Sequence, residues 1–325
     1  MEIKNKFRFM MMLCAALCMP FFASCSDDDD DDSKGGGSAS TGSVVGVPAS
    51  VVDGVLTSSA STTGSGAIST TYNSDGTIDK VVMDGTTYKF EYAETSAAKA
   101  PMKANSAFTN GRTLVRISDA EDASRFTAKD IKFDPQTYFV TSFVETTKES
   151  WGDEYEITTV KYTFSYNSDG TLKSAAINGT WKDSDGESGS AKTTQSYTYS
   201  NGNLTKIEAK NGAYGESTSF EYGDKSLENK YNKIVPMQAA GFGIESAISY
   251  ILAMQGYMGN ASQLLPTKAV YREWGPAEDG EPAYDYSDVY TMSYTFDDIK
   301  RITSISSTNN NMWVVEWLFA YLMLN

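Results

Sequence analysis

The sequence predicts an all-β protein, mainly an antiparallel meander curled into a barrel-like sheet, with one amphipathic helix near residues 244–258. From about residue 44 onward, most segments alternate polar and aromatic residues with a period of two, and short turns rich in Asn, Asp and Gly separate them. About a dozen antiparallel strands cannot remain one flat sheet, because twist accumulates from strand to strand. We therefore expect one β-rich domain over residues 44–325.

The first 24 residues have the layout of a secretory signal peptide, with a basic start and an apolar stretch from Phe9 to Phe22. That stretch is shorter than the roughly 20 residues that a membrane-spanning helix needs. It ends in Phe22-Ala23-Ser24-Cys25, which resembles a bacterial lipobox, whose cysteine is acylated and becomes the first residue of the mature protein. We expect residues 1–24 to be removed and Cys25 to carry the lipid anchor.

Residues 25–43 are expected to form an acidic, Gly/Ser-rich tether, because no large apolar side chain occurs among them. A run of aspartates from Asp27 to Asp32 follows the lipobox. This start of the tether resembles the export signal by which Bacteroidetes lipoproteins reach the outer face of the outer membrane; the residues concerned are Ser26, Asp27, Asp28, Asp29 and Asp30. The resemblance implies a lipid-anchored outer-membrane protein exposed on the cell surface.

The composition excludes several kinds of chemistry. The chain has no histidine and three cysteines, of which Cys14 and Cys18 lie in the signal peptide and Cys25 is the lipidation site. The folded part is therefore expected to lack disulfides, thiol nucleophiles, histidine catalysis and Cys/His-ligated metals. The net charge of −15 argues against nucleic acid as a partner. An enzyme built from this chain would need carboxylates, a Tyr or Lys nucleophile, or a hard metal bound by oxygen.

A hairpin unit recurs along the chain. The segments 72–78 and 166–172 are near-copies that share the turn Asn-Ser-Asp-Gly-Thr, and 199–204 is a shorter version with Asn-Gly. Asp-Gly and Asn-Gly supply the positive φ angles that tight hairpins require. Leu204 and Ile207 lie three residues apart, which favours a bulge directly after the turn.

Three other segments depart from this unit. Two long stretches, about 93–136 and 223–265, are expected to be excursions that leave and rejoin the sheet at the same end. The second contains helically spaced apolar residues and a Gly-Asn stop, which predicts a helix over 244–258 that plugs or caps the sheet. The tail 312–324 is predicted to be the last strand, with a short buried helix as the alternative.

The hairpin units resemble the Tyr-Asp repeats of bacterial surface proteins. Together with the lipobox, with Leu264–Lys268 and with Tyr294–Asp298 followed by Arg301–Thr303, they are similar to a Bacteroidetes surface lipoprotein family, a domain of unknown function with a porin-like fold. The resemblance covers roughly residues 68–321 and implies that fold. It implies no catalytic residues.

One end of the predicted sheet gathers tryptophans and acids, because alternate turns of a meander fall at opposite ends. The candidate ligand rim consists of Trp151, Asp153, Trp181, Asp183, Asp185, Trp274, Glu278 and Asp279. Indole faces stack on sugar CH groups, and carboxylates accept hydrogen bonds from sugar hydroxyls. The alternative is that the tryptophans belong to the core and the acids only keep the loops soluble.

Calcium is the one cofactor that the sequence leaves open, because Asp183, Asp185 and Glu187 form a fragment of a calcium loop.

We interpret the chain as a non-enzymatic protein that binds a glycan or another ligand outside the cell. The alternatives are a carboxylate-dependent glycoside hydrolase and a structural or accessory subunit of an outer-membrane complex. The expected partners are the outer membrane, through the lipid anchor, and a glycan or a surface-complex protein. A membrane-spanning barrel is not expected, because the strand faces opposite the aromatic residues carry Lys, Thr, Ser and Glu.

Overall fold

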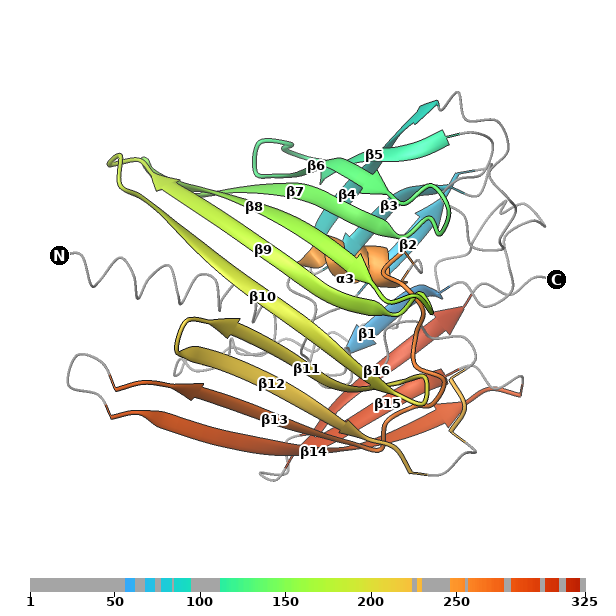
Figure 1. The fold of residues 1–325 in the computed structure, drawn as a ribbon. Helices are drawn as coiled ribbons and strands as arrows, with labels where there is room; N and C mark the ends of the chain where they lie inside the picture. Colours follow the sequence, from blue (N-terminus) through green and yellow to red (C-terminus); the bar gives the residue numbers. More distant parts are fainter. Residues whose placement is uncertain are drawn as a thin grey trace, which may run out of the picture.

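The chain folds into an antiparallel β-barrel with one helix, as a computed structural model shows (Figure 1). The structure describes residues 56–61, 68–73, 77–83, 85–94, 112–223, 227–229, 246–254, 257–277, 282–298, 302–309 and 314–321. In this part of the chain the strands are β1 (Leu56–Ser61), β2 (Ile68–Tyr72), β3 (Ile78–Met83), β4 (Thr86–Glu94), β5 (Arg112–Asp119), β6 (Phe126–Phe133), β7 (Val140–Trp151), β8 (Glu154–Tyr166), β9 (Leu172–Asp183), β10 (Ser188–Ser200), β11 (Asn203–Asn211), β12 (Tyr214–Glu221), β13 (Lys268–Gly275), β14 (Tyr284–Phe296), β15 (Ile302–Asn309) and β16 (Val314–Tyr321). The helix is α3 (Ala247–Met254).

The strands pair in chain order, which confirms the predicted meander, and the sheet closes on itself. Strand β1 completes the ring because it pairs with β16 on one side and with β2 on the other. The tail is therefore a strand, as predicted, and not the alternative short helix.

The prediction that residues 93–136 form an excursion was wrong in part, because β5 and β6 lie within that range. Both strands contain irregularities that hide the period of two. Tyr92 pairs with Leu114 while Glu91 pairs with Arg116, so Val115 is an extra residue in β5. In β6, Asp130 has a φ of 54° at a second register shift. A bulge reverses the alternation that follows it, so the sequence pattern no longer indicates a strand.

The recurring turns are closed in the same way, as expected of near-copies. The Asn73 amide donates to the Thr77 carbonyl at 2.7 Å, and the Asn167 amide donates to the Thr171 carbonyl at 2.9 Å. The predicted bulge after the shorter turn is present, since Tyr199 pairs with Leu204 while Thr198 pairs with Lys206. Equivalent shifts follow the turns after β2, β8 and β14. We call the end that carries these turns the tight-turn end, and the opposite end the hairpin end.

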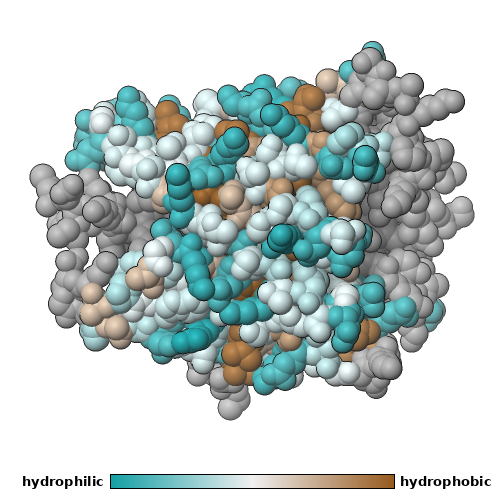
Figure 2. Space-filling model, in the orientation of Figure 1, coloured by the Kyte–Doolittle hydropathy of each residue, from teal (hydrophilic) through white to brown (hydrophobic). Residues whose placement is uncertain are grey.

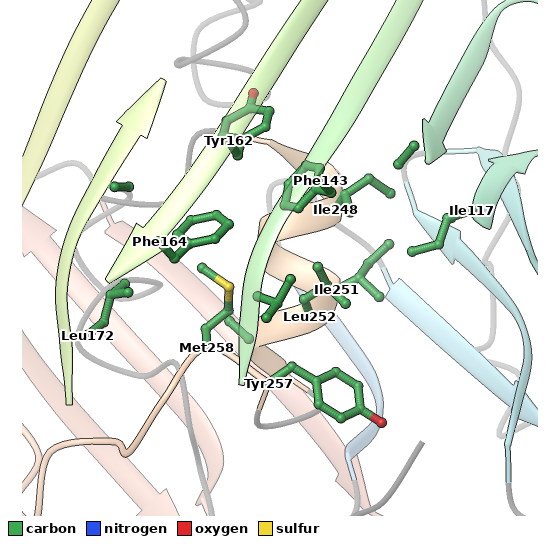
Figure 3. Close-up of a cluster of buried hydrophobic side chains, with 14 of the residues drawn as sticks. Ile117, Phe143, Tyr162, Phe164, Leu172, Ile248, Ile251, Leu252, Tyr257 and Met258 are labelled. Atoms are coloured by element: carbon green, nitrogen blue, oxygen red, sulfur yellow. The ribbon is translucent and has the colours of Figure 1, made fainter. Parts of the chain in front are cut away.

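Helix α3 lies inside the barrel, where it plugs the lumen (Figures 1 and 3). Its Ile248, Ile251 and Leu252 are fully buried in one cluster with wall residues such as Phe143 and Ile117. The helix is shorter than the predicted 244–258, and Ser246 begins it because its hydroxyl accepts a hydrogen bond from the Ser249 amide at 2.9 Å. The plug that the sequence predicted therefore fills the barrel instead of capping its outside.

The chain after α3 closes the tight-turn end. The Tyr257 carbonyl accepts a hydrogen bond from the Val140 amide, and the Asn260 amide donates to the Gly170 carbonyl, both at 2.8 Å. Further along, the Ser262 hydroxyl accepts a hydrogen bond from the Leu204 amide at 3.0 Å. We call residues 257–265 the strap. The strap is therefore hydrogen-bonded to the turns of the tight-turn end.

The outer wall of β8–β10 is polar, as Figure 2 shows for the face in view. Most outward side chains on these strands are exposed or half-buried Lys, Asn, Ser and Thr, among them Lys161, Thr163, Asn178, Lys192 and Ser196. Tyr155, Ile157 and Ala176 are half-buried exceptions in the same register. A barrel wall that faces lipid carries an apolar band instead. No helix in the described part of the chain is long and apolar enough to cross a membrane.

Candidate functional site

Exposed aromatic residues gather at the hairpin end. Among the described residues, four large apolar side chains are exposed, and three of them belong to β7 and β14 at this end: Trp151, Tyr284 and Tyr286. Trp151 is 53 % exposed. It pairs with Glu154 across the β7–β8 turn, which contains Asp153. The predicted tryptophan and its acidic tip are therefore placed together and accessible.

Trp181 lies on the inner face of β9, in register with the buried Ile177 and Ala175. Its half-buried indole lies directly over Gly189 of β10, where any larger side chain would collide with it. Glycine at 189 thus permits the close packing, which holds the ring against the inner wall. Trp181 is an inner-wall residue and does not project from the rim.

Trp274 lies on the outer face of β13, on the opposite side of the wall. Its indole packs over Gly215 of β12, and the Arg272 guanidinium carbon lies 5.3 Å from the ring centre. Trp274 therefore does not share a surface with Trp181, which corrects the prediction that the three indoles form one binding rim. The reason is strand phase, because loop position alone does not fix the face to which a residue belongs. Glu278 and Asp279, the predicted acids of that loop, lie outside the described residues.

The predicted calcium loop closes the β9–β10 hairpin. The Asp183 carboxylate accepts a hydrogen bond from the Glu187 amide at 2.8 Å, so it stabilises the turn that contains Asp185. No three acidic side chains in the described part of the chain are placed to hold one metal ion. Calcium binding by Asp183, Asp185 and Glu187 therefore stays a prediction from the sequence.

A cluster of hydrogen-bonded tyrosines and glutamates lies on the inner face of β12–β14, and it was not predicted from the sequence. The pairing aligns Glu216 with Glu273, and Glu273 with Tyr286. Tyr271 donates to Glu273 at 2.9 Å, Tyr286 donates to it at 2.6 Å, and Tyr284 donates to it at 3.2 Å. We call Glu216, Tyr271, Glu273, Tyr284 and Tyr286 the tyrosine–glutamate cluster.

The two glutamates of this cluster have different hydrogen-bond partners. Burial raises the pKa of Glu216, a hydrogen bond from Tyr271 opposes the shift, and the Glu273 charge adds to it. The Tyr271 hydroxyl lies 3.2 Å from Glu216 and 2.9 Å from Glu273, yet it has one proton to donate. Three phenols approach Glu273, whereas Tyr271 is the phenol that also approaches Glu216.

A periodic signal for the cluster was present in the sequence. Tyr271 and Glu273 are two residues apart, as are Tyr284 and Tyr286, so each pair shares a strand face. The register that aligns the two pairs depends on the length of the β13–β14 loop, which sequence periodicity does not give.

Comparison with known proteins identifies the fold. A porin-like protein from Bacteroides vulgatus matches 83 % of this chain and 99 % of its own, with a TM-score of 0.54 at 15 % sequence identity. A porin-like protein from Bacteroides uniformis matches the same shares at 13 % identity with a TM-score of 0.42, and it adds nothing to the fold assignment. The chain therefore has a porin-like fold. No family model and no curated protein matches the sequence.

The lipidation and export residues lie outside the described residues. Cys25, Ser26 and the aspartate run therefore stay predictions from the sequence.

Proposed function

We propose that this chain is a lipid-anchored protein of the outer membrane that faces outward and binds a glycan at the hairpin end without catalysis. The single observation that carries the binding role is the collection of exposed aromatic rings at that end, since three of the four exposed large apolar side chains lie there. Two of them, Tyr284 and Tyr286, are 36 % and 49 % exposed and donate to one carboxylate. Exposed rings beside fixed hydrogen-bonding groups suit sugar recognition.

The polar outer wall supports anchoring by lipid over insertion of the barrel into the bilayer. Lys and Thr side chains occupy the positions where a spanning barrel presents its apolar band. A lipid on Cys25, followed by the tether over 25–43, would hold such a barrel at the membrane surface.

The binding role is tested by titrating neutral polysaccharide fragments into the purified full-length chain while intrinsic fluorescence and heat are recorded. Tyr286→Ala should weaken binding by about tenfold, because stacking on a ring contributes on the order of 1 kcal/mol and the Glu273 hydrogen bond is lost as well. Tyr286→Phe keeps the ring and should retain most of the affinity. Equal affinities for the parent chain and the Tyr286→Ala variant would exclude this surface.

A glycoside hydrolase is the second candidate, because Glu216 and Glu273 are directly opposed carboxyl groups on β12 and β13, and burial raises the pKa of Glu216. One group of such a pair can act as the acid and the other as the nucleophile or base. The Tyr271 hydroxyl nevertheless lies within hydrogen-bond distance of both carboxyl groups. A substrate would have to displace this hydroxyl before its glycosidic bond could lie between the two carboxyl groups. The observed arrangement therefore favours binding over hydrolysis. Release of reducing sugar by the parent chain, lost in both Glu216→Gln and Glu273→Gln, would reverse this preference.

A further inference from the structure

Glycine at position 275 lets two tyrosine rings meet on the inner wall of the hairpin end. Gly275 of β13 pairs with Tyr284 of β14. A Cβ on Gly275 would lie 2.5 Å from a ring carbon of Tyr284 and 2.8 Å from a ring carbon of Tyr214 on β12. The φ of Gly275 lies outside the left-handed region, so glycine is needed here for space and not for backbone conformation. Gly275 therefore seats both rings against the wall.

Tyr284 and Tyr286 are neighbours on this inner face. They lie two residues apart on β14, so both side chains are in inward register. Their ring centres are 6.4 Å apart, and their ring planes differ by 29°. Both rings are accessible, with exposed fractions of 36 % and 49 %. Because the distance between the ring centres is close to the length of one sugar unit, consecutive units of one glycan chain can each contact a ring.

Glu273 fixes these two rings through both of its carboxylate oxygens. Tyr284 donates to Oε1 at 3.2 Å, and Tyr286 donates to Oε2 at 2.6 Å. Tyr271 also donates to Oε2, at 2.9 Å. A carboxylate has about four acceptor positions, and tyrosine hydroxyls approach three of them. Glu273 therefore contributes to binding through the tyrosines that it positions, and little of its acceptor capacity is left for sugar hydroxyls.

This arrangement favours recognition of sugar faces over recognition of individual hydroxyl groups. A site that recognises one hydroxyl group keeps a hydrogen-bonding partner for it, and it strongly rejects an analogue in which that group is missing or misplaced. Stacking on an aromatic ring depends instead on the apolar CH face of the sugar, which sugars of different configuration share. Affinity should then increase with each ring that the chain covers.

We propose that the hairpin end selects neutral glycan chains by the number of consecutive sugar units with unbranched CH faces, and not by the configuration of single hydroxyl groups. Tyr284 and Tyr286 contact successive units, whereas Gly275 and Glu273 are positioning residues that hold the two rings. This inference rests on the proposed glycan binding and narrows it to chains of at least two units.

The first test is a length series, measured by calorimetry on the purified full-length chain with β1→4-linked glucose oligomers from the monomer to the hexamer. The dimer should bind at least about fivefold more tightly than the monomer, because its second unit covers a second ring. Equal affinities for the monomer and the dimer would overturn the proposal.

The second test replaces glucose by mannose, which differs in the configuration of one hydroxyl group. The β1→4-linked mannose hexamer should bind within about fivefold of the glucose hexamer, because both chains present CH faces to the rings. A larger difference would overturn the proposal, since the site would then distinguish a single hydroxyl group.

Ring variants locate the effect on the inner wall. Tyr284→Ala should remove most of the gain in affinity from monomer to dimer, whereas Tyr284→Phe keeps the ring and should keep the gain. Gly275→Ala should also remove it, because the added methyl group displaces the Tyr284 ring. Trp274→Ala, on the outer face of β13, should leave the series unchanged. Circular dichroism confirms that each barrel is intact, and an undiminished gain in the Tyr284→Ala variant would overturn the proposal.

The role of Glu273 is tested by rescue. Glu273→Ala should reduce the gain in affinity from monomer to dimer, because the two phenols lose their common acceptor. Glu273→Gln keeps an acceptor oxygen and should retain more of the gain than Glu273→Ala. Equal losses in the two variants would show that the carboxylate does not act by positioning the rings.

The outcomes also separate this inference from the proposed function. Binding that depends on Tyr286 but not on chain length would overturn the inference and leave glycan binding in place. Binding of neutral polysaccharide fragments without binding of either oligomer series would have the same meaning. Absence of binding to the fragments and to both series would overturn the inference and the proposed function together.

Discussion

Phe164 and Thr163 are adjacent residues of β8 whose side chains lie on opposite faces of the barrel wall. Phe164 is 7 % exposed and lies 5.8 Å, between ring centres, from Phe143, whereas Thr163 is exposed on the outer wall. We expect Phe164→Ala to lower the free energy of unfolding by about 3–5 kcal/mol, the usual range for a buried ring, and Thr163→Ala to lower it by less than about 1 kcal/mol. Urea titrations of the two variants measure this difference. Similar midpoints would contradict the assigned phase.

Glu145 should make stability depend on pH. Burial raises the pKa of its carboxyl to about 7, and a hydrogen bond from Ser246 opposes the shift. In the unfolded chain this carboxyl titrates near 4.5, so between these values the folded state keeps a proton that the unfolded state has released. The contribution is therefore fully present below about pH 4.5 and is lost as the pH rises through about 7, by up to about 3 kcal/mol.

Urea midpoints measured across this pH range test the expectation. Glu145→Gln cannot titrate, so it should flatten the decline in stability toward neutral pH. Glu208→Gln is the matched control, because the hydrogen bonds from Lys206 and Lys210 hold the pKa of Glu208 below its usual value. An unchanged pH dependence in the Glu145→Gln variant would show that another group is responsible.

Sequence periodicity was sufficient to predict the phase of single residues in regular strands. It placed Tyr162 and Phe164 on the buried face because no irregularity interrupts β8 before its last residues. It could not predict that Glu145 is buried, since an acid on an inward position is indistinguishable from an acid at a rim until the plug is known. The tyrosine–glutamate cluster was missed for a different reason, because the register that aligns β13 with β14 depends on the length of the loop between them.

Among the elements, the strap joins the interior helix to the turns of the tight-turn end. Gly259 has a φ of +91°, and a Cβ at this position would lie 2.7 Å from the Gly170 carbonyl oxygen. Gly186 in the β9–β10 turn has a similar φ of +86°, with no atom within 4 Å of an added Cβ. An alanine at either position would therefore strain the backbone, but only an alanine at 259 would also collide with a neighbouring atom.

We expect Gly186→Ala to cost about 1 kcal/mol from backbone strain, and Gly259→Ala to cost about 1–3 kcal/mol more, because the strap must also move away from Gly170. Differential urea denaturation measures both values. Hydrogen exchange should report faster opening of the Asn260 amide in the Gly259→Ala variant only. Equal costs would mean that the contact between strap and turn contributes no stability.

The elements that sequence predicted are those whose signals are local. The Asn-Ser-Asp-Gly-Thr turns define their own hairpins through contacts such as the 2.9 Å hydrogen bond from the Asn167 side chain to Thr171. The helix was predicted from its apolar spacing, although its position inside the barrel was not. Strands β5 and β6 were missed because the bulges at Val115 and Asp130 break the local pattern that the prediction needs.

At the scale of the whole molecule, closure of the barrel depends on contacts between the two ends of the described chain. Leu56 pairs with Tyr321, and Ser58 pairs with both Ala320 and Ser69. No local pattern indicates such a contact, because its sequence separation spans nearly the whole fold. A curled sheet was predictable from accumulated twist, whereas the closing pair was not.

The position of the barrel relative to the membrane leads to the last prediction. The hairpin end can meet a ligand outside the cell only if the anchored protein faces outward. Asp27–Asp32 are the residues proposed to direct the protein to the outer face of the membrane. We expect protease treatment of intact cells to digest the parent protein. Replacing Asp27–Asp32 by alanine should leave the protein in the membrane fraction but protected from the protease, because the anchor at Cys25 is retained.

Cys25→Ser is the control for the anchor itself, and it should move the protein out of the membrane fraction whatever the state of the aspartate run. Opening the cells before protease treatment should restore digestion of the alanine variant, which excludes a general resistance to the protease. Equal digestion of the parent protein and the alanine variant on intact cells would show that the aspartates do not direct export. Binding by the hairpin end would then have to be explained with another outward-directing signal or with a ligand inside the cell envelope.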